Sequence, residues 1–166
     1  IRWSTDSQSE LMLPADTALW RSLRGSHIGY IQQDIFGAFD PVMTMGQQML
    51  MVISERTGRV DSDFDQELRM KMEEVGLHET ERLFTSYPHQ LSGGQLQRCQ
   101  IAMAIVIRPE LLIADEPTSA ITEAEVEKLF QNIKMLKEQG TGIIYISHKM
   151  DELFEISDRI TVLRDG

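Results

Sequence analysis

The sequence predicts an α/β protein whose parallel β-sheet core carries an inserted all-helical subdomain. Short runs rich in apolar and β-branched residues, which are typical of buried strands, recur at 27–33, 110–115, 142–147 and 159–163. A helical pattern at 122–140 lies between two of these runs, and a strand–helix–strand order implies a parallel crossover. From about 43 to 107 we find only helical patterns. We therefore expect two core segments, 1–42 and 108–166, with a helical subdomain at 43–107 between them.

The helix predicted at 122–140 has signals at both of its ends. Thr122 and Glu125 form the pattern of a capping box, and Gly140 can adopt the left-handed turn that ends many helices. Its apolar residues fall on one face at helical spacing: Val126, Leu129, Phe130, Ile133 and Leu136. In the helical subdomain, the stretch SDFDQELRMKMEEVG has an apolar side formed by Phe64, Leu68, Met72 and Val75.

Length, charge and cysteine content narrow the class of protein. A chain of 166 residues suits one domain with a substantial core. Its net charge of −10 argues against nucleic-acid binding, which needs a basic face. Cys99 is the single cysteine, so a reducing compartment is expected. No apolar run reaches the ~20 residues of a membrane span. Because we see neither an initiator methionine nor a signal peptide, we expect both ends to be cut from something larger.

The stretch YPHQLSGGQLQRCQ, residues 87–100, has two interpretations. In the first it is the start of a helix, because Ser92 and Gln95 form a capping box. That does not explain Gly93 and Gly94, each of which costs about 1 kcal/mol of helix propensity relative to alanine. In the second interpretation, bare backbone N–H groups and the Ser92 hydroxyl form an anion site at the positive end of the helix dipole.

The stretch LLIADEP, residues 111–117, places two carboxylates at the end of a buried strand. Ligands of open parallel sheets bind outside the carboxyl ends of the strands. There Asp115 could hold Mg²⁺, which prefers oxygen ligands, and Glu116 could polarise an attacking water. The alternative is a solvated acidic turn before Pro117.

Two more strands end in polar residues that could reach the same edge of the sheet. His148 ends the run at 142–147, which improves its chance of being functional over that of the other histidines, interpreted as structural: His27, His78 and His89. Gln33 ends the first strand, where a glutamine can ligate a metal or contact a γ-phosphate but can equally cap a turn.

Together these four stretches resemble the ATP-binding-cassette (ABC) ATPases over nearly the whole chain. LSGGQLQR resembles the family's signature motif, LLIADEP its Walker B strand with the catalytic glutamate, SHKMDE its switch-histidine segment, and IQQD its Q-loop, with Gln33 as the family's glutamine. The earlier part of the chain resembles importers of oligopeptides, dipeptides or nickel, and the later part resembles sugar-importer ATPases.

The resemblance implies a P-loop NTPase-like fold and an ATPase that uses ATP and Mg²⁺. Glu116 and His148 would be catalytic, Asp115 and Gln33 would hold the metal, and Gln33 would also contact the nucleotide. Two such domains face each other head to tail, so Ser92, Gly93, Gly94 and Gln95 would hold the γ-phosphate of the partner's ATP. The implied partners are a second ABC ATPase domain and transmembrane permease subunits, and the implied location is peripheral, at the cytoplasmic face of the inner membrane.

The signature interpretation also predicts the effect of a substitution. We expect Gly94→Asp to leave the monomer folded, because a helix start tolerates an acidic residue, but to block ATP-dependent pairing.

The chain departs from the family pattern in two places. Thr122 stands where much of the family has an aspartate, so the usual role across the dimer is not assigned to it. In addition, none of the eleven glycines is followed by lysine, so the phosphate-binding G-x-x-x-x-G-K-[ST] is absent. We expect this P-loop upstream of Ile1, which would make the sheet core incomplete.

Three functions follow as hypotheses. The leading one is the ATPase subunit of an importer of peptide, metal or sugar. The second is a soluble ABC-type ATPase outside transport, which the acidic charge disfavours. The third is a non-catalytic interaction module, since the P-loop is missing.

One cluster of apolar residues remains open between two structural roles. The methionines of PVMTMGQQMLM are core residues in the favoured interpretation, and line a groove for the permease in the other: Met43, Met45, Met49 and Met51.

Overall fold

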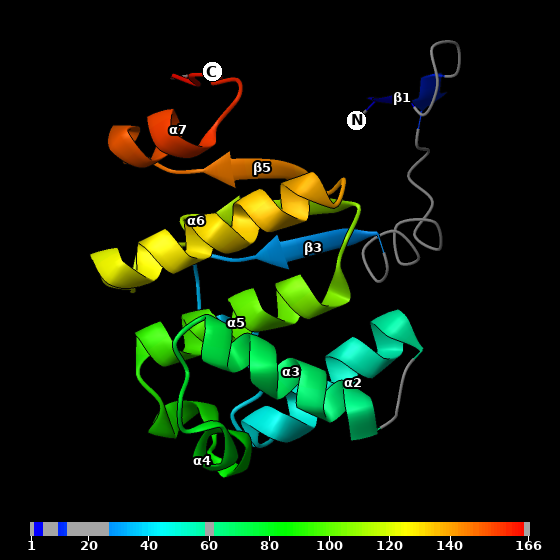
Figure 1. Cartoon of the computed structure of the whole chain (residues 1–166), viewed down its shortest axis with the longest axis vertical. Helices are drawn as coiled ribbons and strands as arrows, with labels where there is room; N and C mark the ends of the chain where they lie inside the picture. The colour runs from blue at the N-terminus through cyan, green and yellow to red at the C-terminus, as the bar shows by residue number, and fades with distance from the viewer. Residues whose placement is uncertain (1, 5–9, 13–26, 59–61, 165–166) are drawn as a thin grey trace.

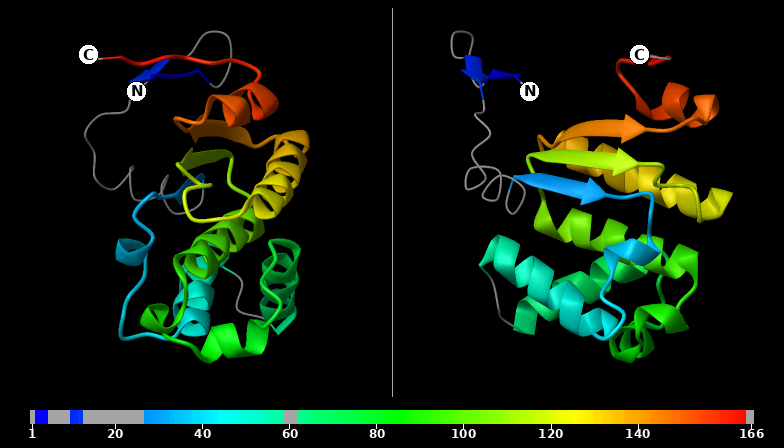
Figure 2. Two further views of the ribbon diagram at one scale, coloured as in Figure 1. Left: turned by 90° about the vertical axis from the view of Figure 1, so that its left-hand side faces the viewer. Right: turned by 180° about the vertical axis from the view of Figure 1, so that it is seen from behind.

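The computed structural model is built around a parallel sheet. Its described residues are 2–4, 10–12, 27–58 and 62–164. Its strands are β3 (Ile28–Ile31), β4 (Leu111–Asp115) and β5 (Gly142–Ile146), of which β3 and β5 are labelled in Figure 1. They lie side by side in the order β3-β4-β5 (Figure 2, right). These strands confirm the first three predicted runs. Two strands that we did not predict form a separate antiparallel pair, β1 (Arg2–Ser4) and β2 (Glu10–Met12).

The strand predicted at 159–163 is wrong, because residues 157–164 have no regular secondary structure. A strand needs a neighbour with which to exchange backbone hydrogen bonds. Within the described residues, β5 is the last strand on its side of the sheet. Val162 and Leu163 are 79% and 91% exposed, so the apolar run also lacks a surface on which to pack.

Helices fill the segment in which we predicted only helical patterns. They are α2 (Met45–Thr57), α3 (Ser62–Glu74), α4 (Thr80–Thr85) and α5 (Gly93–Ile107), together with the short 3-10 turns η1 (Phe36–Ala38) and η2 (Pro88–Gln90). The described residues from 45 to 107 contain no strand. Helix α5 lies between this group and the sheet, since it contacts α2 and α3 as well as β3 (Figure 2).

Two more helices complete the core. Helix α6 (Glu123–Glu138) contacts β5, and α7 (Met150–Ile156) follows that strand. The predicted signals of α6 are confirmed, because the Glu125 carboxylate accepts the backbone N–H of Thr122 at 2.8 Å and Gly140 has a φ of +94°. None of the helices in the described ranges is long and apolar enough to span a bilayer.

Helices α5 and α6 cover one face of the sheet (Figure 2). Residues on that face, such as Leu112 and Ala114, are buried. On the opposite face Tyr30, Ile144 and Ile146 remain exposed. A parallel sheet is normally covered on both faces, whereas within the described residues these three side chains of the second face are left exposed.

The helices between residues 45 and 107 contribute to the same hydrophobic core as the sheet. Three of the four apolar residues predicted to share a side, Leu68, Met72 and Val75, are buried, whereas the side chain of Phe64 lies outside the described residues. Cys99 of α5 is also fully buried, and burial raises the pKa of its thiol to about 12.

The methionine cluster divides between buried and exposed positions. Met45 and Met49 are completely buried and Met43 is half-buried, whereas Met51 is 45% exposed. The core interpretation is therefore confirmed for Met45 and Met49 and wrong for Met51. Residues four positions apart share one face of a helix, whereas Met51, two positions after Met49, lies on the opposite face.

This division predicts unequal effects on stability. We expect Met49→Ala to lower the free energy of unfolding by about 2–5 kcal/mol, because it leaves a cavity in a packed core. The matched control, Met51→Ala, should change it by no more than about 0.5 kcal/mol. Urea denaturation followed by circular dichroism measures both, and equal losses would contradict this assignment.

Candidate functional site

Glu116 lies immediately after β4 in an unusual backbone conformation. Its φ of +46° is one that side-chain-bearing residues rarely adopt, and such conformations cluster at functional sites. The backbone N–H of Glu116 donates to the carbonyl of Ile146 at 2.9 Å, which ties this turn to the end of β5. The strand-end position therefore aims the carboxylate along the carboxyl edge of the sheet.

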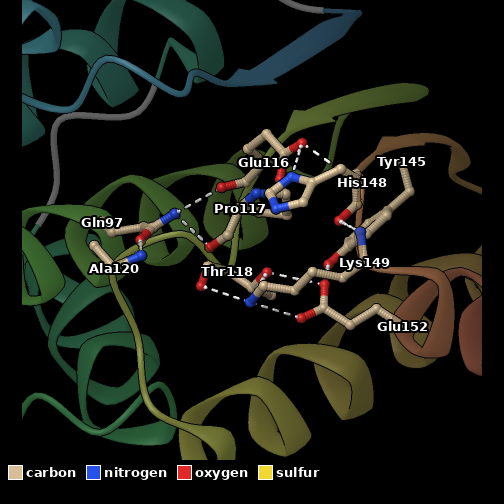
Figure 3. Close-up of polar contacts among 10 residues, drawn as sticks. Gln97, Glu116, Pro117, Thr118, Ala120, Tyr145, His148, Lys149 and Glu152 are labelled. Atoms are coloured by element: carbon tan, nitrogen blue, oxygen red, sulfur yellow. Dashed lines mark hydrogen bonds and ion pairs between the residues drawn. The ribbon is translucent and has the colours of Figure 1, made fainter.

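The two carboxylate oxygens of Glu116 have different surroundings. Oε1 accepts the backbone N–H of His148 at 3.1 Å and lies 2.8 Å from His148 Nδ1 (Figure 3). Oε2 is buried and has no hydrogen-bond partner among the described residues. A buried polar atom without a partner is costly unless a ligand or water satisfies it. Glu116 Oε2 is therefore available to accept a hydrogen bond from a water molecule.

His148 is brought into direct contact with Glu116, as its position at the end of the neighbouring strand suggested. Its side chain is 79% exposed and that of Glu116 only 13%. The pair thus joins a shielded carboxylate to an imidazole that can reach a ligand in solvent.

Asp115 is the last residue of β4 and contacts a residue that we did not predict. The hydroxyl of Tyr30, on β3, donates to Asp115 Oδ2 at 3.2 Å. Desolvation, followed by this hydrogen bond, raises the pKa of Tyr30. The sequence held no signal for this contact, because the register of β3 against β4 cannot be inferred from either segment alone.

Gln33 is exposed just beyond β3, at the same edge of the sheet as Asp115. No hydrogen bond joins the two side chains in the part of the chain that the structure describes. That part also contains no group of three or more His, Cys, Asp or Glu side chains that could hold a metal. One carboxylate with a nearby amide fits Mg²⁺, which takes few protein ligands and keeps water or substrate phosphate oxygens.

The signature stretch forms the predicted capping box at the start of α5. Ser92 Oγ accepts the Gln95 backbone N–H at 3.2 Å, and Gln95 Oε1 accepts the Ser92 N–H at 2.9 Å. Both side chains are thereby fixed by local bonds. An anion at this site would meet mainly the backbone N–H groups of the first turn.

The two glycines of this turn differ in their surroundings. A Cβ atom on Gly94 would lie 2.7 Å from the carbonyl oxygen of Ala120, whereas one on Gly93 would have its nearest neighbour, the Ala120 Cβ, at 3.8 Å. A side chain on Gly94 would therefore require the backbone to shift, so we expect Gly94→Asp to destabilise the monomer as well as to affect pairing. Gly93 is the position at which a side chain can be added without a clash.

The structure thus gathers the predicted residues in two places. Asp115, Glu116 and His148 lie together at the carboxyl edge of the sheet, with Gln33 nearby. The first turn of α5 instead meets the loop 116–120 at Ala120.

A polar network that we did not predict holds the other side of this loop (Figure 3). The Thr118 hydroxyl donates to Glu152 Oε2 at 2.9 Å, and the Tyr145 hydroxyl donates to the same oxygen at 2.8 Å. Lys149 Nζ donates to Thr118 Oγ1 at 3.1 Å and pairs with Glu152. Burial alone would raise the pKa of Glu152, but these hydrogen bonds outweigh it and lower that pKa. The network fastens the loop to α7.

The amide of Gln97, on α5, reaches the same loop from its other side. Gln97 Nε2 donates to the carbonyl oxygens of Glu116 and Pro117, and Oε1 accepts the Ala120 N–H (Figure 3). These contacts join residues about twenty positions apart, which local sequence patterns do not reveal.

Comparison with known proteins identifies relatives of this chain. The family model described as "ABC transporter" matches residues 6–119. The metal-staphylopine import system ATP-binding protein CntD of Staphylococcus aureus (strain NCTC 8325 / PS 47) is 36% identical over 158 residues, which is 93% of this chain and 58% of CntD. The glutathione import ATP-binding protein GsiA of Escherichia coli (strain K12) is 37% identical over 152 residues, 91% of this chain and 24% of GsiA. The chain therefore spans less than two thirds of either relative.

Solved structures of ABC transporter cassettes are also similar to this chain. The dimeric structure of MJ0796, a bacterial ABC transporter cassette, matches with a TM-score of 0.71 and 26% identity over 82% of this chain and 59% of that one. A dimeric post-hydrolysis state of MJ0796 bound to ADP and Pi matches with the same TM-score.

Proposed function

This chain belongs to the ABC transporter family, and we propose that it functions in the nucleotide-binding domain of an ATP-hydrolysing importer subunit. The observation that carries the proposal is the Glu116–His148 pair, in which one carboxylate oxygen is held and the other is buried without a partner among the described residues. The relatives CntD and GsiA, both named as import ATP-binding proteins, support the transport role.

Hydrolysis would take place at the carboxyl edge of the sheet. Glu116 Oε2 orients a water molecule and accepts its proton. The water oxygen bonds to the γ-phosphorus as the bond to the β,γ-bridging oxygen breaks, and ADP leaves. His148 donates a hydrogen bond to the γ-phosphate, where charge is stabilised during the transfer.

Asp115 and Gln33 would hold Mg²⁺, which neutralises charge on the phosphate oxygens when bound. Tyr30 would orient the Asp115 carboxylate through its hydrogen bond to Oδ2.

The partners we propose are a second ATPase domain and the permease subunits. The dimeric MJ0796 structures support pairing, in which the first turn of α5 would face the partner's ATP. The exposed apolar side chains of Phe36, Val42 and Met51 support docking of a permease segment beside α2. The net charge of −10 disfavours nucleic acid as a partner. The protein would lie at the cytoplasmic face of the inner membrane.

The names of the relatives also support a metal complex or a small peptide as the transported substrate. Metal-staphylopine and glutathione are what CntD and GsiA import, so we propose a metal complex or a small peptide in place of a sugar.

A test compares the polypeptide 1–166 with a longer, full-length protein in which a P-loop segment precedes it. We expect 1–166 neither to bind ATP tightly nor to hydrolyse it. Its carboxylates would repel an ATP of about four negative charges, which Mg²⁺ offsets only in part. The full-length protein should do both.

Calorimetric titration with Mg-ATP and a phosphate-release assay measure these outcomes. Micromolar binding by 1–166 with Glu116-dependent turnover would contradict the expectation for the shorter chain. A full-length protein that binds its partners but never hydrolyses ATP would favour the interaction module instead.

A further inference from the structure

We infer that Gln97 is a positioning residue that holds the loop 116–120, and with it Glu116, in the shape required for hydrolysis. The inference rests on the proposed ATPase function. It concerns a residue of the stretch LSGGQLQR that lies beyond the predicted phosphate-holding residues 92–95, and so outside the set of residues that would touch the nucleotide.

A single side chain makes three hydrogen bonds to the backbone of this loop. Gln97 Nε2 donates to the carbonyl oxygen of Glu116 at 3.3 Å and to that of Pro117, and Gln97 Oε1 accepts the Ala120 N–H at 3.0 Å (Figure 3). Gln97 is completely buried. Burial of an amide is costly unless its polar atoms are paired, and here donor and acceptor are both used on the loop.

The loop needs such support because Glu116 is in a strained conformation. A positive φ at a residue with a side chain persists only where the surrounding structure fixes it. Backbone hydrogen bonds join the Glu116 N–H to Ile146 and the Ser119 N–H to the Glu116 carbonyl. Gln97 adds the bonds that fix Pro117 and Ala120.

Because Gln97 lies on α5, its hydrogen bonds also couple this helix to the loop 116–120. Gln97 lies two residues after Gln95, in the helix that begins with the signature glycines. A Cβ on Gly94 would clash with the Ala120 carbonyl, so the start of α5 and the loop are in close contact there as well. A shift of α5 would therefore be passed to the backbone of Glu116.

The test is Gln97→Met in the full-length protein, since methionine has a similar size but cannot make these hydrogen bonds. We expect kcat to fall by about 10-fold or more with the KM for ATP changed less than about twofold, because misplacement of a catalytic group by about 1 Å has effects of this size. The Ala120 amide should also exchange with solvent faster. The matched control is Gln100→Met, one turn further along α5, where Gln100 Oε1 is buried without a partner among the described residues. It should leave kcat unchanged.

A double-mutant cycle separates positioning from a general structural role. In a Glu116→Gln background, Gln97→Met should cause no further loss of turnover, because there is no carboxylate left to position. A full additional loss would overturn the inference.

Gln97→Glu is the second variant, in case Gln97→Met does not fold. It keeps the acceptor for the Ala120 N–H and loses the donors, so kcat should again fall. Wild-type kcat in either folded variant, or loss of fold in both, would overturn the inference. If Glu116→Gln itself left turnover unchanged, the proposed function would fail instead.

Discussion

Glu116→Gln should lower ATP turnover by about 10²-fold or more while ATP binding is retained, which is the scale of losing one acid-base group. Glutamine keeps the size of the side chain and can still accept the His148 N–H that Glu116 Oε1 accepts now. It removes the negative charge that polarises the water. The measurement is phosphate release by the full-length protein, with ATP affinity determined by calorimetry.

The matched control is Asp151→Asn, which removes a charge from an exposed position on α7 close to the site. It should leave turnover near the parental value. Hydrolysis by Glu116→Gln at the parental rate would exclude Glu116 as the group that activates water.

The second large effect is expected at Gly93. Gly93→Asp should leave the monomer folded, because there is space for its Cβ and an acidic residue is tolerated at a helix start. It should weaken ATP-dependent dimerisation by about 10²-fold or more, since a carboxylate would face the partner's phosphate and opposed like charges cost several kcal/mol. Sedimentation with ATP in the Glu116→Gln background measures dimer formation.

Two controls distinguish charge from bulk. Gly93→Ala adds a methyl group without charge and should retain most of the dimerisation. Gly94→Ala should instead reduce the thermal stability of the monomer, because its Cβ would meet the Ala120 carbonyl at 2.7 Å. Unchanged dimerisation of Gly93→Asp would mean that this turn is only a helix start.

The predictable parts of the fold were those with a local signal. The apolar runs of β3, β4 and β5, and the capping residues of α5 and α6, depend on neighbours a few positions away. The run at 159–163 looked equally strand-like, but a strand also depends on a pairing partner that no local pattern shows. The same limit explains why β1 and β2 were missed.

In the candidate site, too, residues with a local sequence signal could be predicted, whereas contacts between distant segments could not. Glu116 and His148 could be placed together because parallel strands end at one edge of a sheet. Gln97 and Tyr30 could not be predicted, since their contacts join segments far apart in the chain. For Gly94 the sequence indicated a bare backbone open to an anion, but not that the carbonyl of Ala120 also lies close to it.

The burial of Cys99 gives the protein a built-in reporter of local opening. A thiol reagent reacts with the thiolate, and with a pKa of about 12 and no exposure the Cys99 thiol is almost unreactive while α5 stays packed. Since it is the one cysteine of the 166 residues, every labelled molecule is one in which this helix has separated from its neighbours. The labelling rate therefore measures how often α5 opens, and α5 is the helix that joins the signature turn to the loop of Glu116.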